Sequence, residues 1–296
     1  MPVVEEVPQS KIKEALAFKA YEIEEVADRF FFRPAGGLFA WAGYYLGMSP
    51  NQVTVVGMVV GIASGVMFYW PRLGLWAFAG LILHSILDSA DGQLARITKK
   101  YSVEGRILDG MGGYFTHISM YLAISCGLYH RGWPGWIFLP MALAGICNAA
   151  HAGMYDYFRN QYIRYGIKGE LPKVEKLDTT TKWGKFLSFV LGDYENNQRR
   201  IARSHAEVQD ELARRFAAAG RLSPEAQESY RRRNYWMVRG WNFLGDNTRF
   251  YAVGLFAFLG RLEWFFAFNL VVMNLALLVL LLLQAGVDRR YLEDLA

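Results

Sequence analysis

The sequence of 296 residues is apolar: 53% of its residues belong to the aliphatic, aromatic, Met and Cys set, and only 20% are charged. Soluble domains carry about 25% charged residues, and here the charges gather in a few stretches, which argues against a soluble protein. Both cysteines, Cys126 and Cys147, lie in apolar runs, which excludes a disulfide framework and a Cys/His zinc site. The net charge of +5 is assigned below to membrane topology and not to nucleic acid.

Apolar runs predict six membrane-spanning helices, since the hydrocarbon core requires about 20 apolar residues per helix. In chain order they cover residues 53–70, 73–87, 107–129, 136–154, 251–259 and 264–283. The fifth run is short. Residues 1–30 carry charges throughout and contain no apolar stretch of the kind that precedes a signal-peptide cleavage site.

The positions of Lys and Arg predict the orientation of these helices. Three alternate connections carry one basic residue each, Arg72, Arg131 and Arg261, and the other 29 of the 32 basic residues lie on the opposite side. Short connections rich in Lys and Arg stay cytoplasmic. We therefore expect both termini in the cytoplasm of a multi-pass protein of the bacterial cytoplasmic membrane. With both termini on one side of the membrane the number of spans must be even, which supports counting the short fifth run as a span.

Two stretches lie outside the spans. Residues 10–32 mix charges with Leu, Phe, Ile and Tyr and predict an amphipathic helix at the membrane interface that ends before Pro34. Residues 160–245 are polar and basic. Within them, residues 196–219 predict a helix closed by Gly220, and Ser223-Pro224 predicts the start of another.

The predicted fold is thus an all-α polytopic membrane protein. It has six transmembrane helices, an interfacial N-terminal helix and a cytoplasmic helical insertion between helices four and five. The predicted boundaries are 1–48 for the interfacial segment, 49–159 for helices one to four, 160–245 for the insertion, and 246–296 for helices five and six with the C-terminal tail.

Three aspartates mark the candidate site. Asp88 and Asp91 lie three residues apart, hence on one side of the second helix, and Asp109 lies at the start of the third. Ionisable residues in spans are costly and point to function. Three carboxylates at one membrane face require a cation, and oxygen ligands suit Mg²⁺ or Mn²⁺. Gly92 and Gly105 would let a nucleotide approach the backbone closely.

The spacing of these residues resembles the signature of the CDP-alcohol phosphotransferase family. It reads Asp88-x-x-Asp91-Gly92-x-x-Ala95-Arg96, eight residues, then Gly105-x-x-x-Asp109. The stretch Ser49–Thr54 is also similar to the start of that family's first helix. The resemblance implies that the three aspartates hold divalent metal and that Gly92, Ala95, Arg96 and Gly105 line the CDP site. It further implies transfer of a phosphoalcohol unit, in particular phosphatidyl, from a CDP-linked donor to an acceptor with release of CMP.

The sequence departs from the family at position 113, where a fourth aspartate is replaced by Gly113. In the family this aspartate is taken as the general base and contributes to a second metal position. One alternative is that His117, one helical turn further, serves as the base; the other role for His117 is helix packing. Further alternatives are an anionic acceptor such as a phosphate, a non-catalytic homologue that binds CDP nucleotide or lipid, and a laboratory substitution.

The partners expected are the CDP-linked donor and membrane lipid, with no nucleic acid. A homodimer, the identity of donor and acceptor, the number of metal ions and the role of the insertion are left open.

Overall fold

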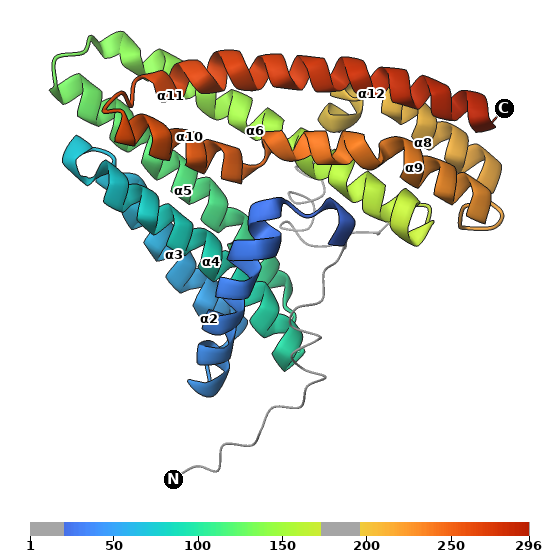
Figure 1. The fold of residues 1–296 in the computed structure, drawn as a ribbon, viewed down its shortest axis with the longest axis horizontal. Helices are drawn as coiled ribbons and strands as arrows, with labels where there is room; N and C mark the ends of the chain where they lie inside the picture. The colour runs from blue at the N-terminus through green and yellow to red at the C-terminus, as the bar shows by residue number, and fades with distance from the viewer. Residues whose placement is uncertain (1–20, 173–195, 296) are drawn as a thin grey trace, which may run out of the picture. The chain divides into compact units, whose positions relative to one another are not determined.

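A computed structural model describes residues 21–172 and 196–295 (Figure 1). In these ranges the chain is helical, and β-structure is limited to one isolated bridge between Glu170 and Arg221. The chain divides into two compact units: Met1–Cys147 with Asn247–Leu270, and Asn148–Asp246 with Val271–Ala296. The predicted all-α class is confirmed.

The first unit contains the candidate site. Its helices are η1 (Tyr21–Ile23), η2 (Asp28–Phe32), α2 (Arg33–Tyr45), α3 (Pro50–Met67), η3 (Pro71–Leu73), α4 (Gly74–Thr98), α5 (Val103–His130), η4 (Gly135–Ile137), the first part of α6 (Phe138–Gln161), α10 (Asp246–Phe258), α11 (Trp264–Ala267) and the start of η7 (Phe268–Met273). Figure 1 shows α3 lying along α4, and α3 packs equally against α5. A core of Phe68, Leu81, Met120, Ile124 and Phe265 fills this packing.

Four segments in the described part of the chain are long and apolar enough to cross a membrane: Pro50–Met67, Pro71–Thr98, Gly135–Lys168 and Trp264–Leu295. They correspond to predicted spans one, two, four and six. The third and fifth predicted spans, now α5 and α10, are not among them. The 13 residues of α10 rise only about 20 Å, less than the hydrocarbon thickness of about 30 Å. Six spans therefore remain a proposal.

The helix predicted to end before Pro34 continues instead. Residues 10–20 lie outside the described part, but from residue 26 the chain stays helical through η2 and α2 to Tyr45. The prediction was wrong about Pro34 because it took the proline as a helix terminator. A proline is tolerated in the first turn, where its missing N–H costs no internal hydrogen bond, and Pro34 stands at that position of α2.

Glycines on one side of α3 set its distance from α4 and α5. Gly57, Gly61 and Gly65 recur every four residues and so share a face. A Cβ atom at Gly61 would lie 2.9 Å from Nδ1 of His84, and one at Gly65 would lie 2.8 Å from the backbone nitrogen of Met120. Such small-residue faces let membrane helices approach closely.

The second unit contains the rest of α6 and the insertion. Its further helices are η5 (Tyr162–Lys168), α8 (Arg203–Phe216), α9 (Pro224–Trp241), η6 (Asn242–Leu244), the end of η7 and α12 (Asn274–Leu295). The helix expected at 196–219 is present over 196–216 with a break at Ala202, and it is followed by a turn at 217–220 in which Gly220 has φ +66°. The predicted start at Ser223 is confirmed, since its side chain accepts a hydrogen bond from the backbone N–H of Ala226.

A buried polar network joins the insertion to α12. The carboxylate of Asp288, 1% exposed, accepts hydrogen bonds from Nδ1 of His205 at 2.9 Å, from Ser204 at 2.8 Å and from Gln284 at 2.8 Å. The hydroxyl of Tyr230 lies 3.1 Å from Nε2 of His205. Burial, reinforced by the Asp288 carboxylate, raises the pKa of Tyr230 well above its ordinary value, so the phenol keeps its proton.

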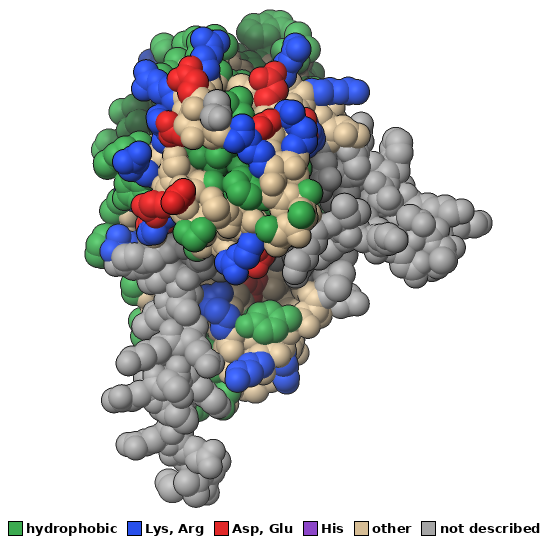
Figure 2. Space-filling view, turned by 90° about the vertical axis from the view of Figure 1, so that its right-hand side faces the viewer, with side chains coloured by type: hydrophobic (Ala, Val, Ile, Leu, Met, Phe, Trp, Pro, Cys, Tyr) green, Lys and Arg blue, Asp and Glu red, His purple; other side chains and the backbone are tan. Residues whose placement is uncertain are grey.

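The outer surface of the insertion is charged. Figure 2 shows Lys and Arg interspersed with Asp and Glu over the end of the molecule formed by α8, α9 and the last turns of α12. Arg214 and Arg215 pair with Glu211, and Arg233 pairs with Asp294. The mixed charges are typical of a surface in water, unlike the exposed apolar faces of α3 and α5.

The close approach of α3 to α5 gives a prediction at Gly65. We expect Gly65→Ala to lower the melting temperature of the detergent-purified protein, because the added Cβ meets backbone of α5 and overpacking costs about 1–3 kcal/mol. The matched control is Gly145→Ala in α6, where nothing lies within 4 Å of the new Cβ. Equal melting temperatures for the two variants, measured by thermal shift, would contradict the packing described.

Candidate functional site

The first turn of α3 is tied to the candidate motif on α4. The hydroxyl of Thr54 donates a hydrogen bond of 2.6 Å to Oδ2 of Asp91. Both residues are buried, at 8% and 7% exposure. An uncompensated carboxylate would be costly there, so the Thr54 hydroxyl helps to hold Asp91 in one orientation.

The same turn of α3 is tied to the start of α5. The side-chain amide of Asn51 donates to the hydroxyl of Ser102 at 3.3 Å. Ser102 caps α5 by accepting from the backbone N–H of Gly105 at 2.9 Å. The turn itself is held by a capping box between Ser49 and Gln52. One helical turn thereby brings the two halves of the motif together.

The predicted metal-binding aspartates differ in environment. Asp88 is exposed and Asp91 is buried, three residues apart on α4. Asp109 lies in the second turn of α5, and its side chain is outside the described part of the structure. Among the side chains that are described, no group of three His, Cys, Asp or Glu residues is close enough to hold a metal ion. The described carboxylates nevertheless offer the hard oxygen donors that Mg²⁺ and Mn²⁺ prefer.

The glycines of the motif stand in opposite surroundings. A Cβ at Gly105 would lie 2.5 Å from Oδ1 of Asn51, so a larger residue there would displace the side chain that bonds Ser102. Among the described residues, a Cβ at Gly92 would meet only Nη1 of Arg96, at 3.7 Å. Packing within the protein therefore explains Gly105 but not Gly92, where the backbone is left open to a ligand.

The remaining motif residues follow on α4. Ala95 and Arg96 are half-buried, and Arg96 lies within electrostatic range of Asp91. The chain then turns at Lys99, which adopts a left-handed conformation with φ 56°. This turn ends α4 and leads into the cap of α5 at Ser102.

Position 113 borders open space, whereas His117 is packed. No atom of the described residues lies within 4 Å of a Cβ built at Gly113, so an aspartate side chain could start there without a clash with them. His117 is 5% exposed, its Nδ1 lies 2.9 Å from the carbonyl oxygen of Gly113, and its ring stacks on Phe250 with centroids 5.3 Å apart. These contacts favour the packing alternative for His117.

Asn51 and Thr54 are site residues that the sequence reasoning did not assign. In the sequence, the Ser49–Thr54 stretch resembles only the start of the family's first helix. The signal that could have identified Thr54 is a polar residue in the first turn of an apolar span, a position that requires a partner.

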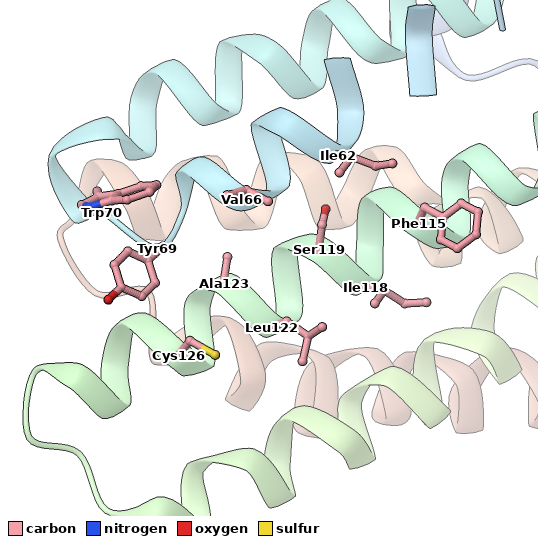
Figure 3. Close-up of a pocket in the computed structure, with 10 residues that line it drawn as sticks. All are labelled: Ile62, Val66, Tyr69, Trp70, Phe115, Ile118, Ser119, Leu122, Ala123 and Cys126. Atoms are coloured by element: carbon pink, nitrogen blue, oxygen red, sulfur yellow. The ribbon is translucent and has the colours of Figure 1, made fainter. Parts of the chain in front are cut away.

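An apolar groove of about 620 Å³ lies between α3 and α5 (Figure 3). Its lining consists of Ile62, Val66, Tyr69, Trp70, Phe115, Ile118, Ser119, Leu122, Ala123 and Cys126. The hydroxyl of Ser119 is bonded to the carbonyl oxygen of Thr116. The groove is lined by no Lys or Arg side chain to offset the charge of a diphosphate, and its residues begin eight positions beyond Thr54 on α3. It is not the nucleotide site.

Comparison with known proteins agrees with the motif. Residues 47–191 match the CDP-alcohol phosphatidyltransferase family. The chain is 36% identical over 84 residues to the archaetidylinositol phosphate synthase of Pyrococcus horikoshii. The aligned region covers 28% of this chain and 43% of that protein. It is 29% identical over 137 residues to the CDP-diacylglycerol–glycerol-3-phosphate 3-phosphatidyltransferase of Cereibacter sphaeroides, covering 45% and 56% of the two chains.

A third relative is cholinephosphotransferase 1 of Danio rerio, 28% identical over 136 residues, with 42% of this chain and 32% of that protein covered. The chain spans less than two thirds of the length of each of these relatives. No solved structure matches.

The bond between Thr54 and Asp91 gives a prediction about metal binding. We expect Thr54→Val to weaken Mn²⁺ binding about tenfold, because residues that orient a metal ligand contribute about 10–100-fold to affinity. Thr54→Ser, which keeps the hydroxyl, should bind like the wild type. Electron paramagnetic resonance titration of the purified full chain measures the affinity.

The control is Thr98→Val, since the Thr98 hydroxyl bonds only to the carbonyl oxygen of Leu94 among the contacts described. If Thr54→Val and Thr98→Val bind Mn²⁺ equally well, Thr54 has no role in orienting Asp91.

Proposed function

Because residues 47–191 carry a CDP-alcohol phosphatidyltransferase domain, we propose that this chain transfers a phosphoalcohol group, in particular phosphatidyl, from a CDP-linked donor to an acceptor and releases CMP. The observation that carries the proposal is the placement of Asp88 and Asp91 beside the open backbone of Gly92, within the matched region. The names of the relatives given above refer to different groups, namely archaetidylinositol phosphate, choline phosphate and glycerol 3-phosphate, so the acceptor is not assigned.

The roles of the residues follow from their chemistry. Asp88, Asp91 and Asp109 would hold Mg²⁺ or Mn²⁺, which when bound neutralises the diphosphate and the leaving CMP. Arg96 pairs with donor phosphate, and Gly92, Ala95 and Gly105 line the CDP site. The acceptor oxygen attacks the phosphorus that carries the alcohol, and the bond from that phosphorus to CMP breaks.

We further propose that the reaction takes place at the cytoplasmic face. The basic connections lie on the same side as the motif, in agreement with the positive-inside rule. Six spans fit this orientation, with α5 and α10 as the two spans in addition to the four long apolar helices. The proposal includes the boundaries predicted from the sequence, namely 1–48, 49–159, 160–245 and 246–296.

The test is CMP release from CDP-diacylglycerol by the full chain in detergent with Mg²⁺, with sn-glycerol 3-phosphate and an inositol phosphate as acceptors. We expect Asp88→Asn, Asp91→Asn and Asp109→Asn each to lose more than about 100-fold in rate, because metal stabilisation of transition-state charge contributes several kcal/mol. Asp210→Asn, an exposed aspartate of the insertion, should retain the wild-type rate.

The second candidate function is a non-catalytic CDP-binding protein, and Gly113 is the observation that favours it. Mg²⁺-dependent binding of CDP without CMP release from any acceptor would support this function. CMP release unaffected in all three aspartate variants would refute the proposed site.

Position 113 gives a separate prediction about the base. Because His117 stacks on Phe250 and its Nδ1 lies 2.9 Å from the carbonyl oxygen of Gly113, we expect His117→Phe, which retains an aromatic ring, to stay within a few-fold of the wild-type rate. An acceptor that is a phosphate has no proton to lose and gives the same expectation. A general base contributes about 10²–10⁴-fold. A base that must be deprotonated to act also gives the rate an acidic limb, so the pH profile of both proteins is the measurement.

Loss of activity in His117→Phe together with loss of that acidic limb would establish His117 as the base. Gly113→Asp is the complementary variant, since its side chain has space. We expect it to abolish turnover, because the glycine belongs to the native site. A strong gain in transfer to a simple alcohol would mean that an ancestral base had been lost.

A further inference from the structure

The start of α2 lies directly on the motif segment of α4. The carbonyl oxygen of Arg33 accepts a hydrogen bond of 2.8 Å from the side-chain amide of Gln93, a fully buried residue next to Gly92. One turn further, a Cβ at Gly36 would lie 2.9 Å from Cβ of Ser89, the residue after Asp88. The backbone of α2 is therefore held against the part of α4 that carries both aspartates.

The side chain of Arg33 adds positive charge at this place. Its Nη2 donates to Oε1 of Glu24 at 2.6 Å, and the two side chains are 16% and 2% exposed. Arg33 also lies within electrostatic range of Arg96 of the motif. Glu24 and Asp91 are also within electrostatic range of Arg96.

Two guanidinium groups within electrostatic range of each other repel. The carboxylates of Glu24 and Asp91 offset part of this repulsion. A phosphate, with up to two negative charges and several acceptor oxygens, complements two guanidinium groups better than a single carboxylate does.

We propose that Arg33, with Arg96, binds a phosphate group of the substrate, and that Glu24 occupies Arg33 until that phosphate arrives. The proposal rests on the proposed function and adds to it a residue outside the motif. The phosphate belongs either to the diphosphate of the donor or to an anionic acceptor, and both present the same chemistry to Arg33. Arg33 would thus help to select phosphorylated substrates.

The experiment compares substitutions on the two sides of the ion pair. Isothermal titration of the purified full chain with CDP in the presence of Mg²⁺ reports on the donor, and titration with sn-glycerol 3-phosphate reports on the acceptor. We expect Arg33→Gln to weaken one of these ligands about tenfold, the size expected for a hydrogen bond to a charged group. Arg33→Lys should fall between this variant and the wild type.

Glu24→Gln separates a binding role from a purely structural one. If Glu24 competes with phosphate for Arg33, this variant binds the same ligand as tightly as the wild type or up to a few-fold more tightly. If the pair only fastens η1 to α2, both substitutions weaken binding and lower the melting temperature together, and the proposal is overturned. Arg29→Gln, on the same helical stretch with its guanidinium over Phe30, is the matched control and should bind both ligands normally.

The two titrations show whether the phosphate that Arg33 binds belongs to the donor or to the acceptor. Weaker CDP binding assigns Arg33 to the donor, and weaker glycerol 3-phosphate binding assigns it to the acceptor. Wild-type affinity of Arg33→Gln for both ligands overturns the inference and leaves the proposed function intact. Absence of Mg²⁺-dependent CDP binding in the wild-type protein contradicts the proposed function itself.

Discussion

The hydrogen bond from Thr54 to Asp91 is the interaction on which the arrangement of the site depends. It joins α3 to α4 within apolar surroundings, where a carboxylate without partners would be costly. The neighbouring Asn51 joins the same turn of α3 to the cap of α5 at Ser102. Because a capping box fixes this turn, both side chains leave α3 in a defined register. The motif is brought together by a helix that contributes no residue to it.

Small residues have two distinct effects around this turn. At Gly61, Gly65 and Gly105 the absence of a side chain lets neighbouring atoms approach to distances that a Cβ would prevent. At Gly92 and Gly113 the surroundings are open, and the missing side chain leaves space. The first group sets the spacing of the helices, and the second leaves backbone of α4 and α5 accessible. Glycine therefore allows close helix packing in the first group and leaves the backbone accessible in the second.

The insertion is organised by a constraint of its own. Asp288 lies on the same helix as the most apolar run of the chain, yet it is buried among polar side chains of α8 and α9 and of α12 itself. A buried carboxylate is stable only when its oxygens accept several hydrogen bonds, and His205, Ser204 and Gln284 supply them. Residues 284–295, expected as a tail, are thereby part of a helix that anchors the insertion.

The sequence by itself determined the helical class, the four long apolar segments and the resemblance to the family, because apolar runs and the spacing from Asp88 to Asp109 are local patterns. It also located the helix start at Ser223, where cap chemistry is local. It could not decide that the helix passes Pro34, since a proline is compatible with a helix end and with a first turn alike. Only the tertiary structure decided that Thr54 bonds Asp91, that Arg33 lies against the motif, and that His117 packs on Phe250. Each of these contacts joins residues 37 to 133 positions apart, and such pairings depend on how helices pack, which no local pattern in the sequence contains.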